Sequence, residues 1–464
     1  MSASGHALAP AAEVAEAALR AATGECVVIV EERFDANVRF ARNSTTTNGV
    51  TRDRSVVVVA FSPGDGGTSV GVASRSGGGA VAELVAAAEA AAASAPAAED
   101  AAPLVDGGAD ASFDEGPADT SLAVFGSLLG DLGEVFASAE AAGHLLAGFA
   151  QHDVTTTYLA SSAGTRRRHV QPTGSLELVA RSGDGTRSSW AARGTPDFSG
   201  LSVHDLDATL ARRLAWAERK VELPAGRYEV LLPPDAVADL MADLAWAMSG
   251  REAEDGGTVF SRGKGRTAIG ERLSEIPFRL SSDPSYPGLE CAPFLVAGGS
   301  SSDVSVFDNG AALAAVAWVE DGRLARLGYH RAGAARSGQR FTPPVDNLIL
   351  EVPGATADLE ELVAGTERAL LLTCLWYIRE VDPATLLLTG LTRDGVYLVE
   401  GGEVRGAVNN FRFNESPVDL LSHTVEAGRT VRALSREWGE YLNRTAMPPL
   451  RVADFNMSSV SPAS

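Results

Sequence analysis

The chain has 464 residues, 45% of them hydrophobic and 21% charged, a balance typical of a folded, water-soluble protein with two or three cores. Its formal net charge of −21 argues against nucleic acid as a main partner, because phosphate binding needs clustered Lys and Arg. The three cysteines, Cys26, Cys291 and Cys374, lie far apart in apolar contexts, which indicates buried, reduced thiols and a cytoplasmic setting.

The first part of the chain is expected to form helices and antiparallel strands, which is an α+β fold class. Its start lacks a basic segment followed by a continuous apolar core, so we expect no signal peptide. No uninterrupted apolar run reaches the length of a membrane span, so we expect no membrane association. The spacing of apolar residues predicts a helix over residues 8–22. The elements predicted next are strands at Cys26–Glu32, Asn37–Gly49, Arg54–Ser62 and Thr68–Gly77, a hairpin turn at Asn48-Gly49 and a helix over Gly79–Ala95.

A segment rich in Ala, Asp, Pro and Gly, Ser94–Pro117, then predicts a mobile acidic connector. Beyond it we expect a helix over Leu122–Ala142, strands from Leu145 to Arg193 and a helix over Leu201–Lys220. The segment Glu222–Gly226 marks the predicted boundary between two domains. We therefore expect an α+β N-terminal domain of residues 1–221 and a β-rich C-terminal domain of residues 222–464.

The second domain is predicted to begin with a strand over Arg227–Pro233 and a helix over Asp235–Ser249. Pro234 stands at the head of this helix, where a missing N–H costs nothing. Strands and turns continue to Val352, and Leu359–Tyr377 predicts a helix or a pair of helices. Strand-like runs with glycine turns follow, and the Gly401-Gly402 pair predicts a hairpin.

Several motifs in this second domain are similar to those of one protein family. They are Val381-Asp382-Pro383, Leu388-Thr389-Gly390, Gly395-Val396-Tyr397, Gly402-Glu403-Val404 and Asn409-Asn410-Phe411-Arg412-Phe413, with support from Gly288–Gly310 and Met447–Ser459. Through them the chain resembles the TldD/PmbA family, the paired proteins described as metallopeptidases. Val38–Asn43 extends the similarity loosely to the first domain. The resemblance implies a two-domain TldD/PmbA-like α+β fold.

The helix over Asp235–Ser249 is where the resemblance bears on chemistry. For the family's catalytic subunit, the resemblance implies an H-E-x-x-x-H motif on this helix, in which two His bind zinc and the Glu acts as general base. It also implies a further Cys ligand near the chain end. Here the helix has no His, residues 450–464 have no Cys, and no two of the seven His are four residues apart. We therefore expect no catalytic residue, no metal site and no cofactor in this chain, with the zinc on a partner subunit.

Other chemical signals have simpler interpretations. Cys374, in an apolar run expected to be helical, is a candidate nucleophile, but a buried structural thiol is favoured. Glu252 and Glu254, with Asp255, could do acid–base work, although a solvated loop explains them. The glycine-rich Ser261–Gly270 lacks the spacing of a phosphate-binding loop. The basic run Arg166–His169 predicts a hairpin turn with solvated charges.

The candidate substrate-binding residues are Asp346, Asn347, Asn409 and Asn410. The resemblance implies that strands such as Asp346–Glu351 line a cavity between partner subunits, where an extended peptide could pair with the main chain. An ordinary core strand is the equal alternative.

The resemblance implies a TldE/PmbA-like subunit that pairs with a TldD-like catalytic subunit to cleave unfolded or modified peptides. Whether the chain is itself an enzyme stays open, as does the alternative of a stand-alone or homodimeric peptide-binding or regulatory protein. We also expect the strands within Leu386–Phe413 and Asp346–Glu351 to form a wall that a partner covers, with apolar positions in Leu386–Leu388 and Val396–Val399 facing outward.

Overall fold

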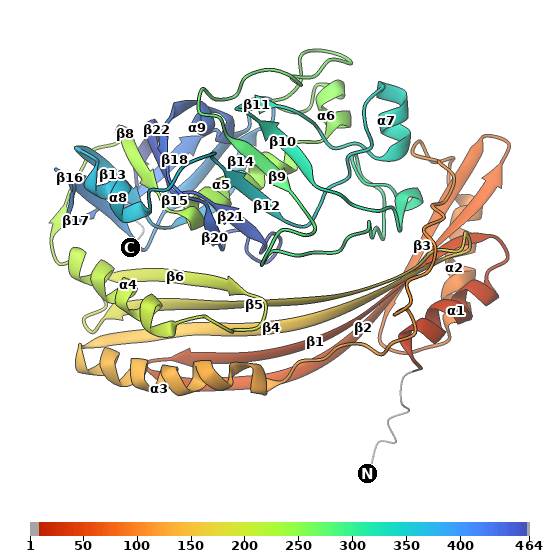
Figure 1. The fold of residues 1–464 in the computed structure, drawn as a ribbon, viewed down its shortest axis with the longest axis horizontal. Helices are drawn as coiled ribbons and strands as arrows, with labels where there is room; N and C mark the ends of the chain where they lie inside the picture. The colour runs from red at the N-terminus through yellow and green to blue at the C-terminus, as the bar shows by residue number, and fades with distance from the viewer. Residues whose placement is uncertain (1–8, 462–464) are drawn as a thin grey trace, which may run out of the picture.

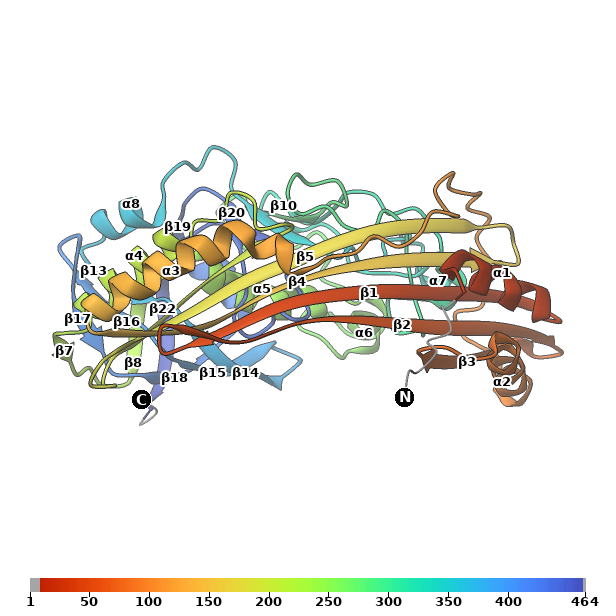
Figure 2. The ribbon, with the colours of Figure 1, turned by 90° about the horizontal axis from the view of Figure 1, so that it is seen from below.

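The computed structural model describes residues 9–461, which form two layers lying face to face (Figure 1). One layer is a sheet of long strands with helices on its outer face, and the other contains the C-terminal half. Figure 2 shows the long strands running along most of the molecule. Residues 1–8 lie outside the described residues. They include the first residue of the expected N-terminal helix and the start of the segment in which we expect no signal peptide. The α+β class is confirmed.

The first layer is a six-stranded antiparallel sheet in the order β3-β2-β1-β4-β5-β6. The hairpin predicted at Asn48-Gly49 is wrong: both residues lie inside the ladder, opposite Val38 and Asn37. The chain turns instead at Arg42 and Asn43, which adopt left-handed backbone angles (φ 52° and 57°). The predicted shorter strands therefore merge into longer ones. The six are β1 (Glu25–Ala41), β2 (Ser44–Gly64), β3 (Gly67–Ser76), β4 (His144–Ser161), β5 (Arg166–Ser182) and β6 (Ser188–Thr195).

Helices cover the outer face of this sheet, close to their predicted positions. Helix α2 approaches β3 closely at Gly71, where a Cβ would lie 2.1 Å from the carbonyl oxygen of Ala88. The predicted connector has no helix or strand beyond Ser94, the last residue of α2, yet it is tied to the sheet, because Asp110 N–H donates to the Arg166 carbonyl. The helices are α1 (Ala11–Ala21), α2 (Val81–Ser94), the 3-10 turn η1 (Leu122–Phe125), α3 (Gly126–Ala141) and α4 (Val203–Trp216).

The helical segment Leu122–Ala141 is long and apolar enough, by length and composition, to cross a membrane. This differs from the expectation that no run reaches that length. Its residues Leu128, Leu132 and Val135 are buried in the core that β1, β4 and β5 share with α3 and α4. The segment is therefore a partly buried core helix whose outer face is rich in small residues.

The C-terminal half contains two further sheets. One has the order β11-β10-β9-β12-β21-β20, and the longer one β14-β15-β18-β22-β8-β13-β16-β17-β7, with β19 paired to β22. The strands are β7 (Lys220–Val221), β8 (Gly226–Leu232), β9 (Arg279–Ser282), β10 (Val316–Glu320), β11 (Arg323–Leu324), β12 (Leu348–Glu351), β13 (Arg368–Leu372), β14 (Leu375–Asp382), β15 (Leu387–Thr392), β16 (Val396–Glu400), β17 (Glu403–Val408), β18 (Phe411–Glu415), β19 (Thr424–Ala427), β20 (Val431–Ala433), β21 (Thr445–Met447) and β22 (Leu450–Val460).

Helix α5 (Pro234–Trp246) forms the centre of this half, with every residue from Ala236 to Leu244 buried. Its start at Pro234 is as predicted. The shorter helices around it are α6 (Gly250–Asp255), the 3-10 turn η2 (Val306–Asp308), α7 (Arg331–Ser337), α8 (Leu359–Ala364) and α9 (Pro417–His423).

The helix predicted over Leu359–Tyr377 is wrong beyond Ala364. Residues Leu370–Leu372 form part of β13, paired with β16 on one side and with β8 on the other. A central strand buried on both faces is apolar throughout, so its pattern does not differ from that of a buried helix. The Gly401-Gly402 hairpin is confirmed, with φ of 61° and 76°.

The outward-facing wall expected at Leu386–Leu388 and Val396–Val399 is also wrong. Leu386, Leu388 and the whole of Val396–Val399 are buried within this chain. Val396–Val399 lies in the inner strand β16, which is covered on both faces. Leu386 and Leu388 pack in the main core at or beside β15, and only Leu387 between them is partly exposed. A partner therefore cannot reach the buried side chains of Leu386, Leu388 and Val396–Val399 in the folded protein.

Candidate functional site

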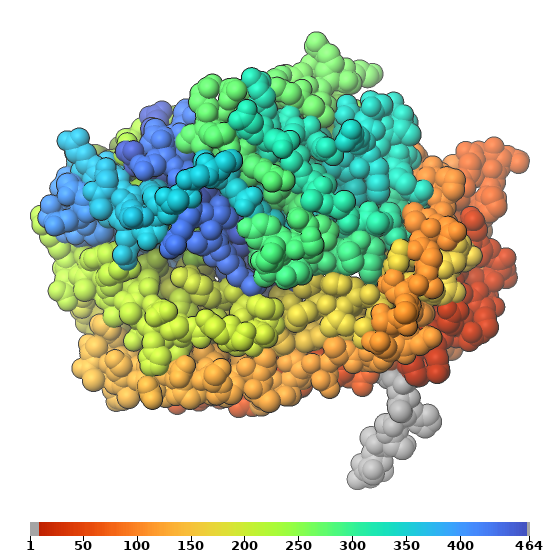
Figure 3. Space-filling model, in the orientation of Figure 1, coloured from red at the N-terminus to blue at the C-terminus, as the bar shows by residue number. Residues whose placement is uncertain are grey.

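A cavity of about 1370 Å³ lies between the two layers. Its volume exceeds the roughly 300–1,000 Å³ that small-molecule pockets usually have. Strands β1, β4 and β5 form one wall, and segments of the C-terminal half form the other. Figure 3 shows the boundary along which the yellow strands of the first layer meet the green and blue C-terminal half.

The wall made by the first layer is polar because of strand alternation. On β4, Gln151, Asp153 and Thr155 face the cavity, whereas His152 and Val154 between them are buried. On β5, the residues that face the cavity are His169, Gln171, Thr173, Ser175 and Glu177. Because the two strands are in antiparallel register, Thr155 lies beside Gln171 and Asp153 beside Thr173. Successive side chains of a strand point to opposite faces, so this row of polar groups is a direct consequence of the sequence and register.

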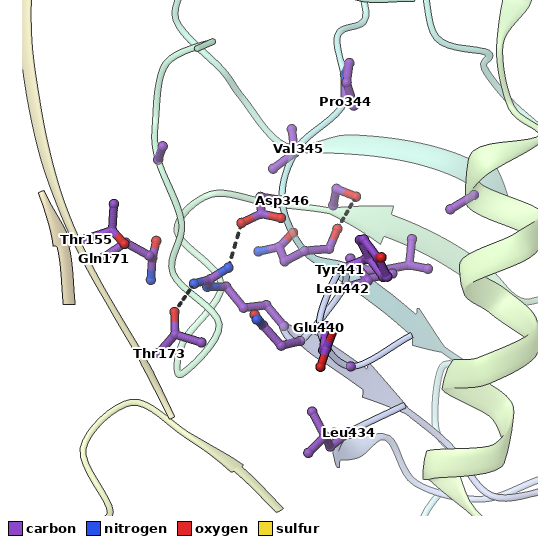
Figure 4. A pocket seen from close by; sticks show the side chains of 18 of the residues that line it. Thr155, Gln171, Thr173, Pro344, Val345, Asp346, Leu434, Glu440, Tyr441 and Leu442 are labelled. Atoms are coloured by element: carbon purple, nitrogen blue, oxygen red, sulfur yellow. Dashed lines mark hydrogen bonds and ion pairs between the residues drawn. The ribbon is translucent and has the colours of Figure 1, made fainter. Parts of the chain in front are cut away.

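Arg444 joins the two walls by bonding Asp346 and Thr173, which Figure 4 labels on opposite sides of the cavity. Its Nη1 donates to the Asp346 carboxylate at 2.6 Å, and its Nη2 donates to the Thr173 hydroxyl. The Arg444 side chain is only 9% exposed, whereas that of Asp346 is 60% exposed toward the cavity space. Protein surrounds this space, and the resulting desolvation raises the pKa of Asp346, while Arg444 opposes the rise.

The four predicted substrate-binding residues separate into two places. Asp346 and Asn347 line the cavity, but Asn409 and Asn410 are not among the residues that line it. Asn347 is 1% exposed, and its amide donates to the carbonyls of Asp283 and Leu289. Asn347 therefore stabilises the loop that contains Asp283 and Leu289. Of the two residues, Asp346 is the one that faces the open space of the cavity.

Asn409 and Asn410 lie between β17 and β18, where the chain passes β7. The Oδ1 of Asn409 accepts from the N–H of Leu223 at 2.8 Å, and the carbonyl of Asn410 accepts from Ser461 N–H. The Asn409 bond ties the segment that links the two layers to the large sheet, and the Asn410 bond holds the residue after β22. Their observed role is structural, and the assignment of both residues to substrate binding stays a prediction.

The C-terminal end of α5 also reaches the cavity. The residues that line it there are Ala245, Trp246 and Met248. None of these side chains is a common metal ligand, since proteins hold zinc with Cys, His, Asp and Glu. Over residues 9–461 no group of three or more such side chains could hold a metal ion.

Three aspartates on α5 lie four residues apart and face the segment Leu434–Trp438. Asp235 accepts from Leu434 N–H at 2.9 Å, Asp239 from Glu437 N–H at 2.8 Å, and Asp243 from the Trp438 indole at 3.0 Å. Desolvation raises the pKa of Asp239 to about 8 and that of Asp243 to about 7. The carboxylates position this segment, whose continuation to Arg444 lines the cavity.

Charged groups in the cavity are mostly acidic. The acidic residues are Glu31, Asp153, Glu177, Asp303, Asp346, Glu437 and Glu440, against the basic residues Arg33, Arg436 and Arg444. Aromatic rings lie among them, including Trp246, Trp376 and Tyr441. The Tyr441 side chain is 72% exposed and that of Trp246 49%.

The remaining candidate groups do not form a reactive site. Cys374 lies between two strands and is 1% exposed, and desolvation raises its pKa to about 12, which disfavours a thiolate. Glu254 is not simply solvated, because it accepts from the hydroxyls of Tyr329 and Ser337. The basic run is the start of β5 rather than a turn with solvated charges. Its arginines pair with acidic groups: Arg166 with Glu16, Arg167 with Asp110 and Arg168 with Glu115.

The sequence prediction missed most of the cavity. Arg444 and the polar faces of β4 and β5 were not selected, although on β5 His169, Gln171, Thr173, Ser175 and Glu177 alternate with Val170, Pro172, Gly174 and Leu176. That alternation could have identified a polar sheet face. Nothing local to Arg444 indicates that it meets Thr173, which lies 271 positions earlier in the chain.

A long antiparallel sheet closed over a β-rich half, with a large polar cavity between them, defines a two-layer protein that can enclose an extended ligand. The family model described as the PmbA/TldA metallopeptidase C-terminal domain matches residues 225–459, and that of the central domain matches residues 128–218. The chain belongs to the PmbA/TldD metallopeptidase family.

Solved structures show the same fold at low sequence identity. TldE from Thermococcus kodakarensis superposes with a TM-score of 0.77 at 15% identity, covering 96% of this chain and 98% of that one. A proposed DNA gyrase modulator from Thermotoga maritima gives 0.74 at 16% identity, covering 93% and 95%. Another from Bacteroides thetaiotaomicron gives 0.71 at 14% identity, covering 97% and 98%. No curated protein matches the sequence.

Proposed function

We propose that this chain is a TldE-like subunit of a TldD/TldE-type metallopeptidase complex in the cytoplasm. In this proposal it binds an unfolded or modified peptide while a TldD-like partner supplies the zinc and the cleavage chemistry. The observation that carries the proposal is the end of α5, which reaches the cavity with Ala245, Trp246 and Met248 and with no metal ligand.

The geometry of the cavity supports a peptide as its ligand. Its volume of about 1370 Å³ and its position beside long strands suit an extended chain. Hydroxyl and amide groups of Gln151, Thr155 and Gln171 can accept from and donate to a peptide main chain without selecting one side chain. A folded protein cannot enter a hollow between two layers, so the same arrangement would restrict access to unfolded segments.

The chain's own residues would hold and orient a peptide. Arg444 fixes Asp346 and connects it to β5, so the two walls keep their spacing. The resemblance to TldE supports a heterodimer, and the exposed aromatic rings Trp246 and Tyr441 at the cavity offer apolar surface that a partner could cover.

The test is to co-express this chain with a sibling chain that carries H-E-x-x-x-H, purify the complex and measure zinc and peptide cleavage. We expect copurification, about one zinc per heterodimer held by the sibling, and cleavage only when both subunits are present. The control is each subunit purified alone. Cleavage by the sibling alone at the full rate, or zinc bound by this chain, would overturn the proposal. Peptide binding without copurification would favour a stand-alone or homodimeric regulatory protein instead.

A further inference from the structure

We infer that the cavity selects peptide segments rich in Lys or Arg, a preference that rests on the proposed peptide-binding function. The inference follows from which charges in the cavity are already neutralised and which are not. It concerns the class of ligand, and it does not depend on where cleavage takes place.

The three arginines of the cavity are occupied by groups of this chain. Arg33 pairs with Asp153 at 3.2 Å, and Arg444 pairs with Asp346 at 2.6 Å. The opposite charges of an ion pair largely cancel each other's field at a distance. These two arginines therefore offer little positive charge to an acidic ligand.

Arg436 is enclosed by aromatic rings. Its guanidinium carbon lies 4.7 Å from the centre of the Trp190 ring and 4.9 Å from that of Trp376, and its Nη2 lies 3.5 Å from Asp394. Its Nη1 is buried and has no hydrogen-bond partner among the described residues. The group is therefore sealed between the rings rather than presented to the cavity. The stack also shows that ring faces here accept a cation.

Four carboxylates in the cavity have no basic partner among the ion pairs of residues 9–461. Glu31 and Glu177 lie on the sheet wall, and Asp303 and Glu440 lie on the opposite wall. Three of them accept hydrogen bonds from neutral groups. Glu31 accepts from the Ser55 and Thr157 hydroxyls, Glu177 from the Trp190 indole and Asp303 from the Ser301 hydroxyl. Negative charge thus approaches the ligand space from both sides.

Charge on both walls of a cavity focuses the electrostatic field in the space between them. A Lys or Arg side chain of an extended peptide would gain favourable interactions with Glu177 or Glu440, and its charged end could also lie on the rings of Trp246 or Tyr441. An acidic side chain would meet uncompensated carboxylates. Alternate side chains of an extended peptide point to opposite sides, so one peptide can contact both walls of the cavity at once.

The test measures binding of fluorescent, unstructured peptides of about ten residues to this chain alone by anisotropy. The peptides have the same Gly/Ser background and carry Lys, Gln or Glu at alternate positions. We expect the Lys peptide to bind at least about tenfold more tightly than the Glu peptide, with a difference that shrinks as salt screens the charges. Equal affinity for all three peptides, or tighter binding of the Glu peptide, would overturn the inference.

A pair of variants separates the cavity from the overall charge of −21. The double substitution Glu177→Gln and Glu440→Gln should reduce the preference for the Lys peptide severalfold. The control, Glu140→Gln with Glu367→Gln, removes the same charge from exposed residues outside the cavity and should leave the preference unchanged. All four residues are exposed, so the variants should fold. An equal loss in both variants would mean that net charge, not the cavity, attracts the peptide.

The result can be told apart from that of the proposed function. A chain that prefers the Lys peptide but joins no peptidase complex would retain this inference and overturn the proposed function. A heterodimer that binds and cleaves Lys and Glu peptides equally well would support the proposed function and overturn this inference. Absence of binding to any peptide, by the chain and by the heterodimer, would overturn both.

Discussion

The Arg444 guanidinium donates a 2.6 Å hydrogen bond to the Asp346 carboxylate and, through its other terminal nitrogen, bonds Thr173 on the opposite wall of the cavity. Asp346 belongs to the C-terminal half and Thr173 to the long sheet. One side chain therefore links the two layers across the cavity. Because Arg444 is buried and Asp346 is partly exposed to the cavity, the pair is only partly screened by solvent.

Replacing Arg444 with Met should destabilise the protein by about 1–3 kcal/mol. The change leaves the desolvated Asp346 carboxylate without its partner and the Thr173 hydroxyl without its donor. The measurement is urea unfolding. Adding Asp346→Asn should recover part of the loss, because the unpaired charge is then removed. Arg405→Met is the matched control: Arg405 pairs with Glu403 at an exposed site, and its loss should cost less than about 1 kcal/mol. An equal cost for both single variants would contradict a special role for Arg444.

Asp239 should make the protein less stable as the pH rises through neutrality. Its pKa is raised to about 8 by burial, well above the ordinary value near 4, so the folded state retains the proton longer than the unfolded chain. For a carboxyl with a raised pKa, unfolding is then favoured increasingly as the pH rises from about 4 to about 8. Urea unfolding at several pH values should show a smaller decline for Asp239→Asn than for the unchanged protein. Asp205→Asn, at an exposed helix start, is the control. Parallel pH profiles of the Asp239 variant and the unchanged protein would contradict this expectation.

Leu398 should behave as a core residue rather than as an interface residue. It is 5% exposed and packs in the main core of the C-terminal half, so Leu398→Ala should lower the free energy of unfolding by about 2–5 kcal/mol. Val381 is 56% exposed on the edge strand β14. Val381→Ala should therefore change the free energy of unfolding by less than about 0.5 kcal/mol. Chemical denaturation of this chain alone decides whether Leu398 is a core residue or an interface residue. A fully stable Leu398→Ala variant that fails to bind a partner would support the predicted interface at Val396–Val399.

The three thiols should be inert in the folded protein. Cys26, Cys291 and Cys374 are all buried, and desolvation raises the pKa of Cys26 and Cys291 to about 11 and that of Cys374 to about 12. A thiol-specific colour reagent should therefore react slowly with the native protein and rapidly with all three thiols in urea. Cys374→Ala should leave peptide cleavage by a purified complex unchanged. Fast reaction of one native thiol together with loss of cleavage in that variant would revive Cys374 as a nucleophile.

Much of the fold could be predicted from the sequence where local patterns suffice. The helices around Ala11–Ala21 and Val81–Ser94 follow from apolar spacing, and the Gly401-Gly402 hairpin follows from two residues that tolerate positive φ. The motifs of the C-terminal half were enough to indicate the family. The same local patterns failed at Leu370–Leu372, because a strand buried on both faces and a buried helix have equally apolar sequences.

The sequence by itself determined the α+β class, the family, and the absence of His from residues 235–249 and of Cys from residues 450–464. It also determined that polar residues alternate along β4 and β5. Only the tertiary structure decided that this polar face closes against Asp346 and Arg444, and that Val396–Val399 lies in the core. These facts depend on strand order and on contacts between residues hundreds of positions apart, which no local spacing encodes. Side-chain type and alternation are local properties of the chain, whereas the meeting of two walls depends on how the whole chain packs.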